Sequence, residues 1–99
     1  MAKAEIRWTR EAATWLQDIH DYIAQDDPQA AARVVQGIYD RVQVLADYPQ
    51  IGHKYRSVAE GEIRILIYGH YRIPYLLRGS HTLEILGVFH GSLDFDRYL

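Results

Sequence analysis

The stretch that decides the fold covers residues 62–90 and reads EIRILIYGHYRIPYLLRGSHTLEILGVFH. Its first run places the isoleucines at positions 63, 65 and 67 on one face of a β-strand. Gly69 and His70 then separate two runs of strand-forming residues, and such a two-residue Gly-X loop is typical of a type II′ hairpin. A second turn at residues 78–81 leads into the last run. The stretch therefore predicts three consecutive antiparallel strands.

Two features of this stretch predict how its strands are placed. Pro74 has no backbone N–H to donate, which indicates an edge strand, a bulge or a locally unpaired position. The last run, residues 82–90, has apolar side chains on both faces and is expected to be the central strand. With residues paired directly across the first turn, Arg64 and Arg72 fall on opposite faces of the sheet, unless Pro74 shifts the register.

Ahead of this stretch, the sequence predicts a short strand and two amphipathic helices. Residues 5–8 alternate apolar and polar side chains, and Thr9 is a suitable N-cap for the first helix. Asp27 and Pro28 suit the N-cap and the first position of the second helix, so that the helices form a hairpin with a very short turn. The apolar stripes have the helical period and comprise Ala12, Leu16, Ile19 and Ile23, then Ala31, Val35, Ile38, Val42 and Leu45.

The predicted fold class is α+β. The N-terminal helical hairpin is expected to pack on a small antiparallel sheet, which is formed by the short strand at residues 6–8 and the three strands of residues 62–90. Residues 49–61 show no periodicity and are expected to form a surface loop. This loop contains a basic and aromatic cluster formed by His53, Lys54, Tyr55 and Arg56. A solvated loop is the favoured interpretation of the cluster, but because loops on a rigid scaffold often contain functional residues, it is a secondary candidate for target contact.

Length and composition narrow the class of protein. A chain of 99 residues, 48% hydrophobic and 24% charged, is expected to form one domain, residues 1–99, around a single core. The chain has no apolar run of the roughly 20 residues that a membrane span needs, no apolar segment typical of a secretory signal, and no cysteine. We therefore expect a cytoplasmic protein without a membrane span, a disulfide or a thiolate metal site.

The charge balance and the residue spacing argue against two further kinds of site. The formal net charge is −2, whereas a protein that binds RNA or DNA mainly by neutralising phosphates is normally much more basic. His20 lies near Asp18 and Asp21, but it is not separated from either by the three or four residues that bring helical side chains together. No metal and no cofactor are expected.

A series of residues along nearly the whole chain indicates a family resemblance. The series comprises Ile6-Arg7-Trp8, Ala12, Leu16, Asp21-Tyr22-Ile23-Ala24, Pro28, Ala31-Ala32, Leu45, Pro49, Gly52, Arg64, Tyr71-Arg72-Ile73-Pro74-Tyr75 and Ile85-Leu86-Gly87-Val88-Phe89-His90. In this order and at this spacing, the residues resemble the ParE/RelE toxin superfamily of bacterial type II toxin–antitoxin and plasmid-stabilisation systems.

The resemblance implies a protein partner. A cognate antitoxin is expected, a small protein whose C-terminal segment folds as it binds the toxin. This segment would place an apolar helix or strand over grooves by the helices and the sheet edge. A hetero-oligomer of toxin and antitoxin is therefore expected.

The two branches of the superfamily act on different targets. RelE-like members are ribosome-dependent mRNA endonucleases, whereas ParE-like members act on DNA gyrase without a known hydrolytic step. The endonuclease branch is matched in part, because Arg72 corresponds to its strand arginine and Tyr98 to its tail tyrosine. His90 is a candidate general acid or base, because imidazole side chains are suited to proton transfer, with a structural hydrogen-bonding role at the end of a buried strand as the favoured alternative. On the endonuclease alternative the chain is an mRNA endoribonuclease with the catalytic residues Arg72, His90 and Tyr98.

Three observations favour the gyrase branch, in which the chain is not an enzyme. Ser92 stands where the ribonucleases tend to have a second arginine, and Lys3 and Lys54 are the only lysines of the chain. The ending from His90 to Asp94 resembles the His-x-x-x-Asp ending common in ParE-like members. A non-toxic homologue that only binds an antitoxin is a third alternative. The candidate target-binding residues are Arg64, His53, Lys54, Tyr55, Arg56 and Asp94, with a solvated or salt-bridged role as the favoured alternative for Arg64.

Overall fold

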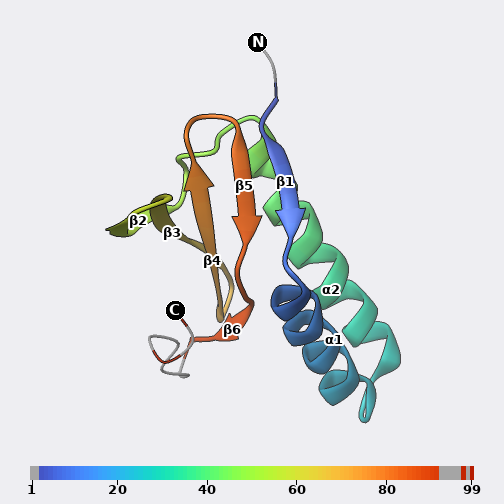
Figure 1. Ribbon diagram of the computed structural model, residues 1–99. Coiled ribbons are helices and arrows are strands. Elements are labelled where there is room, and N and C mark those ends of the chain that lie inside the picture. Colours follow the sequence, from blue (N-terminus) through green and yellow to red (C-terminus); the bar gives the residue numbers. More distant parts are fainter. Residues whose placement is uncertain (1–2, 92–96, 98) are drawn as a thin grey trace.

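The computed structural model describes residues 3–91, 97 and 99. Its elements in chain order are β1 (Glu5–Trp8), α1 (Arg10–Ala24), α2 (Pro28–Gln43), a short 3-10 helix (Val44–Ala46), β2 (His53–Val58), β3 (Gly61–Tyr68), β4 (Tyr71–Arg78), β5 (Thr82–Ile85) and β6 (Phe89–His90) (Figure 1). The two helices lie together on one side of the sheet, which confirms the predicted α+β fold with a helical hairpin. None of the described helices is long and apolar enough to cross a membrane.

Both helices begin at the predicted caps. The Thr9 hydroxyl accepts a hydrogen bond from the Ala12 N–H at 3.1 Å and donates one to the Ile85 carbonyl at 2.7 Å. The Asp27 carboxylate accepts from the N–H groups of Gln29 and Ala30, both at 3.1 Å. These bonds satisfy backbone donors that the first helical turn leaves unpaired. Thr9 also fixes the start of α1 to strand β5.

The sheet differs from the prediction in the direction of one strand, because β1 is parallel to its partner. Its strand order is β1-β5-β4-β3-β2, with β6 paired to β4. Strand β1 pairs with β5 in parallel, from Glu5 opposite Thr82 to Trp8 opposite Ile85. The sheet is therefore mixed rather than antiparallel throughout. Only strands joined by a tight turn must be antiparallel, and β1 is separated from β5 by both helices and three strands.

The prediction that residues 49–61 form a surface loop is wrong for the six residues of β2. This strand pairs antiparallel with β3, from His53 opposite Ile65 to Val58 opposite Gly61. The register shifts between Lys54 and Arg56, which indicates a bulge at Tyr55. An edge strand with mostly exposed residues and a bulge has no regular apolar alternation. The sequence pattern therefore does not reveal it.

The last predicted strand is divided, and it is not the central one. Residues 86–88 separate β5 from β6, and the central strand is β4, with β3 on one side and both β5 and β6 on the other. A side chain at Gly87 would meet the Phe89 ring at 2.5 Å, so the break packs tightly against β6. The apolar residues on both faces of this segment reflect its position in the interior of the sheet, where it lies beside the central strand β4.

Pro74 lies in the middle of β4 and does not shift its register. It pairs with Ile65 of β3, and the ladder is regular from Glu62 opposite Leu77 to Tyr68 opposite Tyr71. The Pro74 carbonyl accepts from the Leu86 N–H at 2.9 Å, so the proline nitrogen also faces the gap between β5 and β6. The predicted locally unpaired position is confirmed, and the alternatives of an edge strand and a bulge are wrong.

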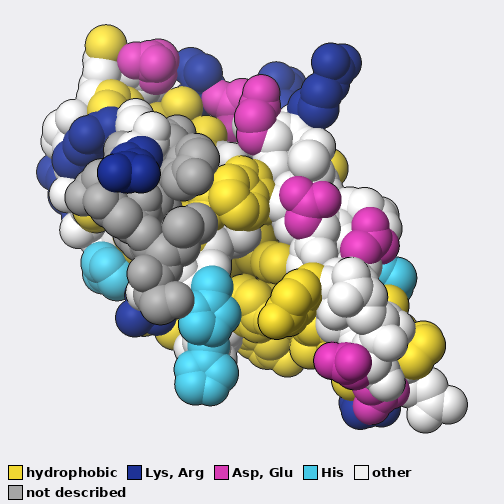
Figure 2. Space-filling model, turned by 90° about the horizontal axis from the view of Figure 1, so that it is seen from below, with side chains coloured by type: hydrophobic (Ala, Val, Ile, Leu, Met, Phe, Trp, Pro, Cys, Tyr) yellow, Lys and Arg dark blue, Asp and Glu magenta, His cyan; other side chains and the backbone are white. Residues whose placement is uncertain are grey.

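The main core lies between the helices and one face of the sheet. Its fully buried members include Ile38, Val42 and Leu45 from the helical layer and Leu66, Ile73, Tyr75, Leu83 and Ile85 from the strands. Trp15 of α1 packs edge-on against Phe89 of β6, with ring centroids 4.6 Å apart. Figure 2, seen from below, shows the apolar side chains gathered beside the helices at this end of the molecule.

Candidate functional site

The pairing of β6 with β4 assembles a small pocket from three parts of the chain. This site, the Arg72 pocket, has a volume of about 260 Å³ and is lined by Arg72 of β4, His90 of β6, His70 of the β3–β4 turn, and two glycines, Gly69 and Gly91. Phe89 pairs with Arg72, and the Gly91 N–H donates to the His70 carbonyl at 2.6 Å. The structure thus brings together two of the three predicted catalytic residues. Tyr98 lies outside the described residues.

His70 belongs to this pocket although the sequence reasoning did not select it. Gly69 has φ +56° and no described residue other than glycine has a positive φ, which fits the predicted type II′ turn. This turn returns the chain so that His70 stacks on His90, with ring centroids 6.2 Å apart and an interplanar angle of 21°. The position of His70 in a turn next to Arg72 was the available clue, but its closeness to His90 depends on the pairing of β6.

The chemistry available in the pocket is limited. Arg72 provides one permanent positive charge, which suits a phosphate or a carboxylate. Each imidazole has a ring nitrogen that can donate or accept a hydrogen bond. The described lining residues include no lysine, no carboxylate and no second arginine. The pocket can therefore bind an anion and exchange a proton, but it concentrates little positive charge.

Arg64 lies on the opposite face of the sheet from Arg72, as the predicted register requires. Its guanidinium donates to the Glu62 carboxylate at 2.7 Å and to the carbonyls of Gln50 and Gly52 at 3.0 and 2.6 Å. Its side chain is only 17% exposed. These contacts fit the salt-bridged alternative and fix the segment after the helices to the sheet. A role of Arg64 in target binding stays a prediction.

Tyr75 fixes the same segment from β4. Its hydroxyl accepts from the Gly52 N–H at 3.0 Å and donates to the Pro49 carbonyl at 2.8 Å. Burial raises the pKa of the Tyr75 hydroxyl, and the hydrogen bond from Gly52 acts in the opposite direction. The hydroxyl therefore remains a proton donor at neutral pH, and both of its hydrogen bonds stay in place.

The Glu62 carboxylate is the electrostatic centre of this face. The hydrogen bond from Arg64 lowers the pKa of Glu62 below its ordinary value of 4.5, and Lys54, whose Nζ lies 3.7 Å away, adds to the effect. A carboxyl whose pKa is lower in the folded chain stabilises the fold above its unfolded pKa. This stabilisation is lost as the pH falls through the folded pKa.

We expect Glu62→Gln to make the free energy of unfolding less dependent on acid pH. At pH 6 the variant should be less stable than the wild type, and the difference should shrink below pH 4.5 as Glu62 of the wild type becomes protonated. Denaturant unfolding at several pH values between about 2 and 6 measures this. Glu60→Gln, in the β2–β3 turn, is the matched control. If the difference in the free energy of unfolding between Glu62→Gln and the wild type stays constant with pH, the expected role of the Glu62 charge is contradicted.

Four of the remaining predicted target-binding residues lie on the edge strand β2, namely His53, Lys54, Tyr55 and Arg56. Lys54 forms the ion pair with Glu62, and Arg56 stacks over the Tyr55 ring at 5.8 Å and donates to the Leu99 backbone oxygen at 2.6 Å. His53 is exposed on the same strand. Asp94 lies outside the described residues. The target-binding role of this group stays a prediction.

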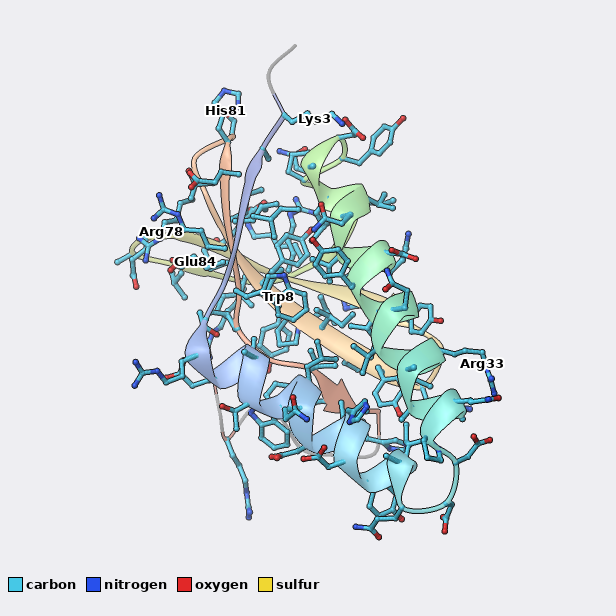
Figure 3. The ribbon with its side chains drawn as sticks, turned by 90° about the vertical axis from the view of Figure 1, so that its right-hand side faces the viewer. Lys3, Trp8, Arg33, Arg78, His81 and Glu84 are labelled. Carbon is cyan, nitrogen blue, oxygen red and sulfur yellow. The ribbon has the colours of Figure 1, made fainter. Side chains whose placement is uncertain are left out.

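A second concave surface lies between the two helices. This α1–α2 groove has a volume of about 320 Å³ and is lined by Trp8, Ala13, Leu16, Gln17, His20, Val35 and Tyr39. Figure 3 shows Trp8 of β1 between the strand and the helices. The Trp8 Nε1 atom is buried and has no hydrogen-bond partner among the described residues. The lining is mostly apolar, so the groove can hold apolar side chains.

Comparison with known proteins shows relatives over most of the chain. Residues 6–95 match the family model described as the ParE toxin of the type II toxin–antitoxin system parDE. A protein of Sinorhizobium fredii with the name "Putative toxin Y4kP" is 41% identical over the full length of both chains.

Two solved structures have similar folds at 26% sequence identity. The first comes from a chromosomal ParDE system of P. aeruginosa, with a TM-score of 0.72 over 89% of this chain and 96% of that one. The second comes from the RelBE2 toxin–antitoxin complex of Mycobacterium tuberculosis, with a TM-score of 0.59 over 89% of this chain and 98% of that one. This chain belongs to the ParE toxin family of type II toxin–antitoxin systems.

Proposed function

We propose that this toxin inhibits DNA gyrase by binding to it and is neutralised by a cognate antitoxin. The observation that carries the proposal is the match of residues 6–95 to the ParE model, since ParE-like toxins act on gyrase. The Arg72 pocket supports binding over RNA cleavage, because its described lining contains a single permanent cation. A site that transfers a phosphoryl group or cleaves a phosphodiester normally places several cations around the negative charge that develops in the transition state. The net charge of −2 also disfavours a surface for ribosomal RNA.

One observation favours a second candidate function, a ribosome-dependent mRNA endonuclease. Arg72, His90 and His70 meet in one pocket, and an arginine with two imidazoles has the groups needed to hold a phosphate and move a proton. The fold is also similar to that of the RelBE2 complex. On this alternative Arg72 would hold the scissile phosphate, and a histidine would exchange the proton of the attacking 2′-hydroxyl.

The two functions are separated by assaying the purified toxin on both targets. We expect the wild type to inhibit supercoiling by gyrase and to leave mRNA on translating ribosomes intact. Arg72→Ala is compared with Arg78→Ala, since Arg78 lies at the other end of β4 and pairs with Glu84 there (Figure 3). Ribosome-dependent cuts that disappear only in Arg72→Ala would overturn the proposal in favour of the endonuclease. Activity in neither assay would favour a homologue that only binds an antitoxin.

The antitoxin part of the proposal is supported by two surfaces on one side of the molecule. The α1–α2 groove has an apolar lining that suits the apolar face of a partner helix. Strand β1 forms the edge of the sheet and pairs only with β5 among the described residues, so its outer edge can accept a further strand. Trp8 belongs to both surfaces. We propose that the antitoxin covers them together.

A further inference from the structure

The segment between the helices and β2 exposes two large apolar side chains next to each other. Tyr48 is 64% exposed and Ile51 is 46% exposed. Together with Pro49 and Gln50 they line a shallow, mostly apolar hollow of about 350 Å³. We call residues 48–51 the 48–51 loop. Single exposed apolar side chains are common and need no explanation, whereas here two of them flank one hollow.

The 48–51 loop is held in place by side chains of the sheet. Tyr75 binds the backbone of Pro49 and Gly52, and Arg64 binds the carbonyls of Gln50 and Gly52. Tyr75 itself is fully buried. The backbone of the loop is thus fixed from beneath, while the side chains of Tyr48 and Ile51 point to the surface. A loop ordered in advance loses less conformational entropy when it binds a partner.

The charge beside the loop indicates what kind of partner fits. Residues 48–58 contain Lys54 and Arg56 and no carboxylate, although the chain as a whole has a net charge of −2. The neighbouring carboxylates are already paired, because Asp47 lies 3.8 Å from Lys3 and Glu62 is shared by Lys54 and Arg64. The Lys54 side chain is 51% exposed. An apolar hollow beside exposed cations is complementary to a protein surface that presents an apolar side chain flanked by carboxylates.

We propose that the 48–51 loop, with Lys54 beside it, is the surface by which this toxin contacts its protein target. The target surface offers an apolar or aromatic side chain to the hollow and carboxylates to Lys54. Tyr75 and Arg64 are positioning residues that hold the loop. This inference rests on the proposed inhibition of gyrase by binding, and it locates that contact away from the Arg72 pocket, which lies at the turn at the other end of β3.

The test compares two double variants with matched substitutions in the supercoiling assay. Tyr48→Ser with Ile51→Ser removes the apolar contact of the loop. Tyr22→Ser with Ile67→Ser removes an equally exposed pair, 75% and 43% exposed, from two other elements. We expect the loop variant to need about tenfold more toxin for half-inhibition, as the loss of an interface hot spot would require. The control should stay within about twofold of the wild type.

A charge variant tests the chemistry of the partner. Lys54→Glu should also weaken inhibition, and the loss should become smaller at high salt, because the repulsion it introduces is screened. Arg33→Glu, on the outer end of α2 (Figure 3), is the control. Thermal unfolding of each variant within a few degrees of the wild type shows that the fold is retained.

The outcomes separate this inference from the proposed function. If the wild type does not inhibit gyrase, the proposed function fails and the inference fails with it. If the wild type and the loop variant inhibit equally, the inference alone is overturned. It is also overturned if the loop variant loses only affinity for the antitoxin, because the loop would then be an antitoxin surface. If the variant loses only the self-association measured by light scattering, the loop is a contact between two copies of the toxin, and the inference is again overturned.

Discussion

Gly52→Ala is expected to lower the free energy of unfolding by about 3 kcal/mol. A Cβ at Gly52 would lie 2.7 and 2.8 Å from the Cε1 and hydroxyl oxygen of Tyr75, and 2.9 Å from the Ile65 carbonyl. The first two atoms belong to a buried ring and the third to the backbone of β3, so none of them can move away easily. Relief of the clash should separate the Gly52 N–H from Tyr75 and leave buried polar groups without partners.

Denaturant unfolding measures this effect, with Gly79→Ala as the control. Gly79 has φ +58° and open space around its Cα, so the substitution there costs only backbone strain, about 1 kcal/mol. Equal losses in the two variants would contradict the expected clash at Gly52. Because the 48–51 loop is anchored beside Gly52, the variant should also inhibit the target less at temperatures where it is still folded.

Ala13→Arg is expected to weaken antitoxin binding about 100-fold, which corresponds to about 2.7 kcal/mol. Ala13 is exposed and lines the α1–α2 groove, so a long charged side chain there would fill the space proposed for the apolar face of the antitoxin. Arginine is a good helix former, and α1 should therefore keep its stability. Titration calorimetry with the purified antitoxin measures the affinity, and co-expressed antitoxin should no longer restore growth.

The matched control introduces the same side chain at the next residue of the same helix. Thr14 is also exposed but does not line the groove. The Thr14→Arg variant should therefore bind the antitoxin with an affinity within about threefold of that of the wild type, since an exposed substitution outside an interface usually has little effect. If both variants bind as well as the wild type, the antitoxin does not occupy the groove, and the β1 edge would be the remaining surface for it.

The local parts of the fold were predictable because their causes lie within a few residues. The helix starts at Arg10 and Pro28 depend on the caps Thr9 and Asp27, which bond the next turn. The hairpin at Gly69 depends on a glycine with positive φ between two strand-forming runs. The register of β3 against β4 follows from that turn, and it correctly placed Arg64 and Arg72 on opposite faces.

The site was predictable only in part. Arg72 and His90 were selected from the family resemblance, but their meeting in one pocket requires that β6 pair with β4 beyond the break at residues 86–88. His70 entered the pocket through the same pairing. The role of Arg64 depended on the loop carbonyls of Gln50 and Gly52, which come from a segment without periodicity. Such contacts join residues that are distant in sequence, and no local pattern encodes them.

The helical hairpin, the three runs of residues 62–90 and the toxin family follow from local patterns, because caps, turns, periodicity and the order of residues along the chain can be recognised without a structure. Three further features depend on how the elements pack together. Strand β2 forms because β3 offers it an edge, β1 runs parallel to β5 because a long connection leaves its direction free, and Pro74 fits the central strand because the gap between β5 and β6 lies opposite its nitrogen. The partner of β1 comes from a distant part of the chain, whereas β2 is next to β3 in sequence and lacks the apolar alternation that would have revealed it.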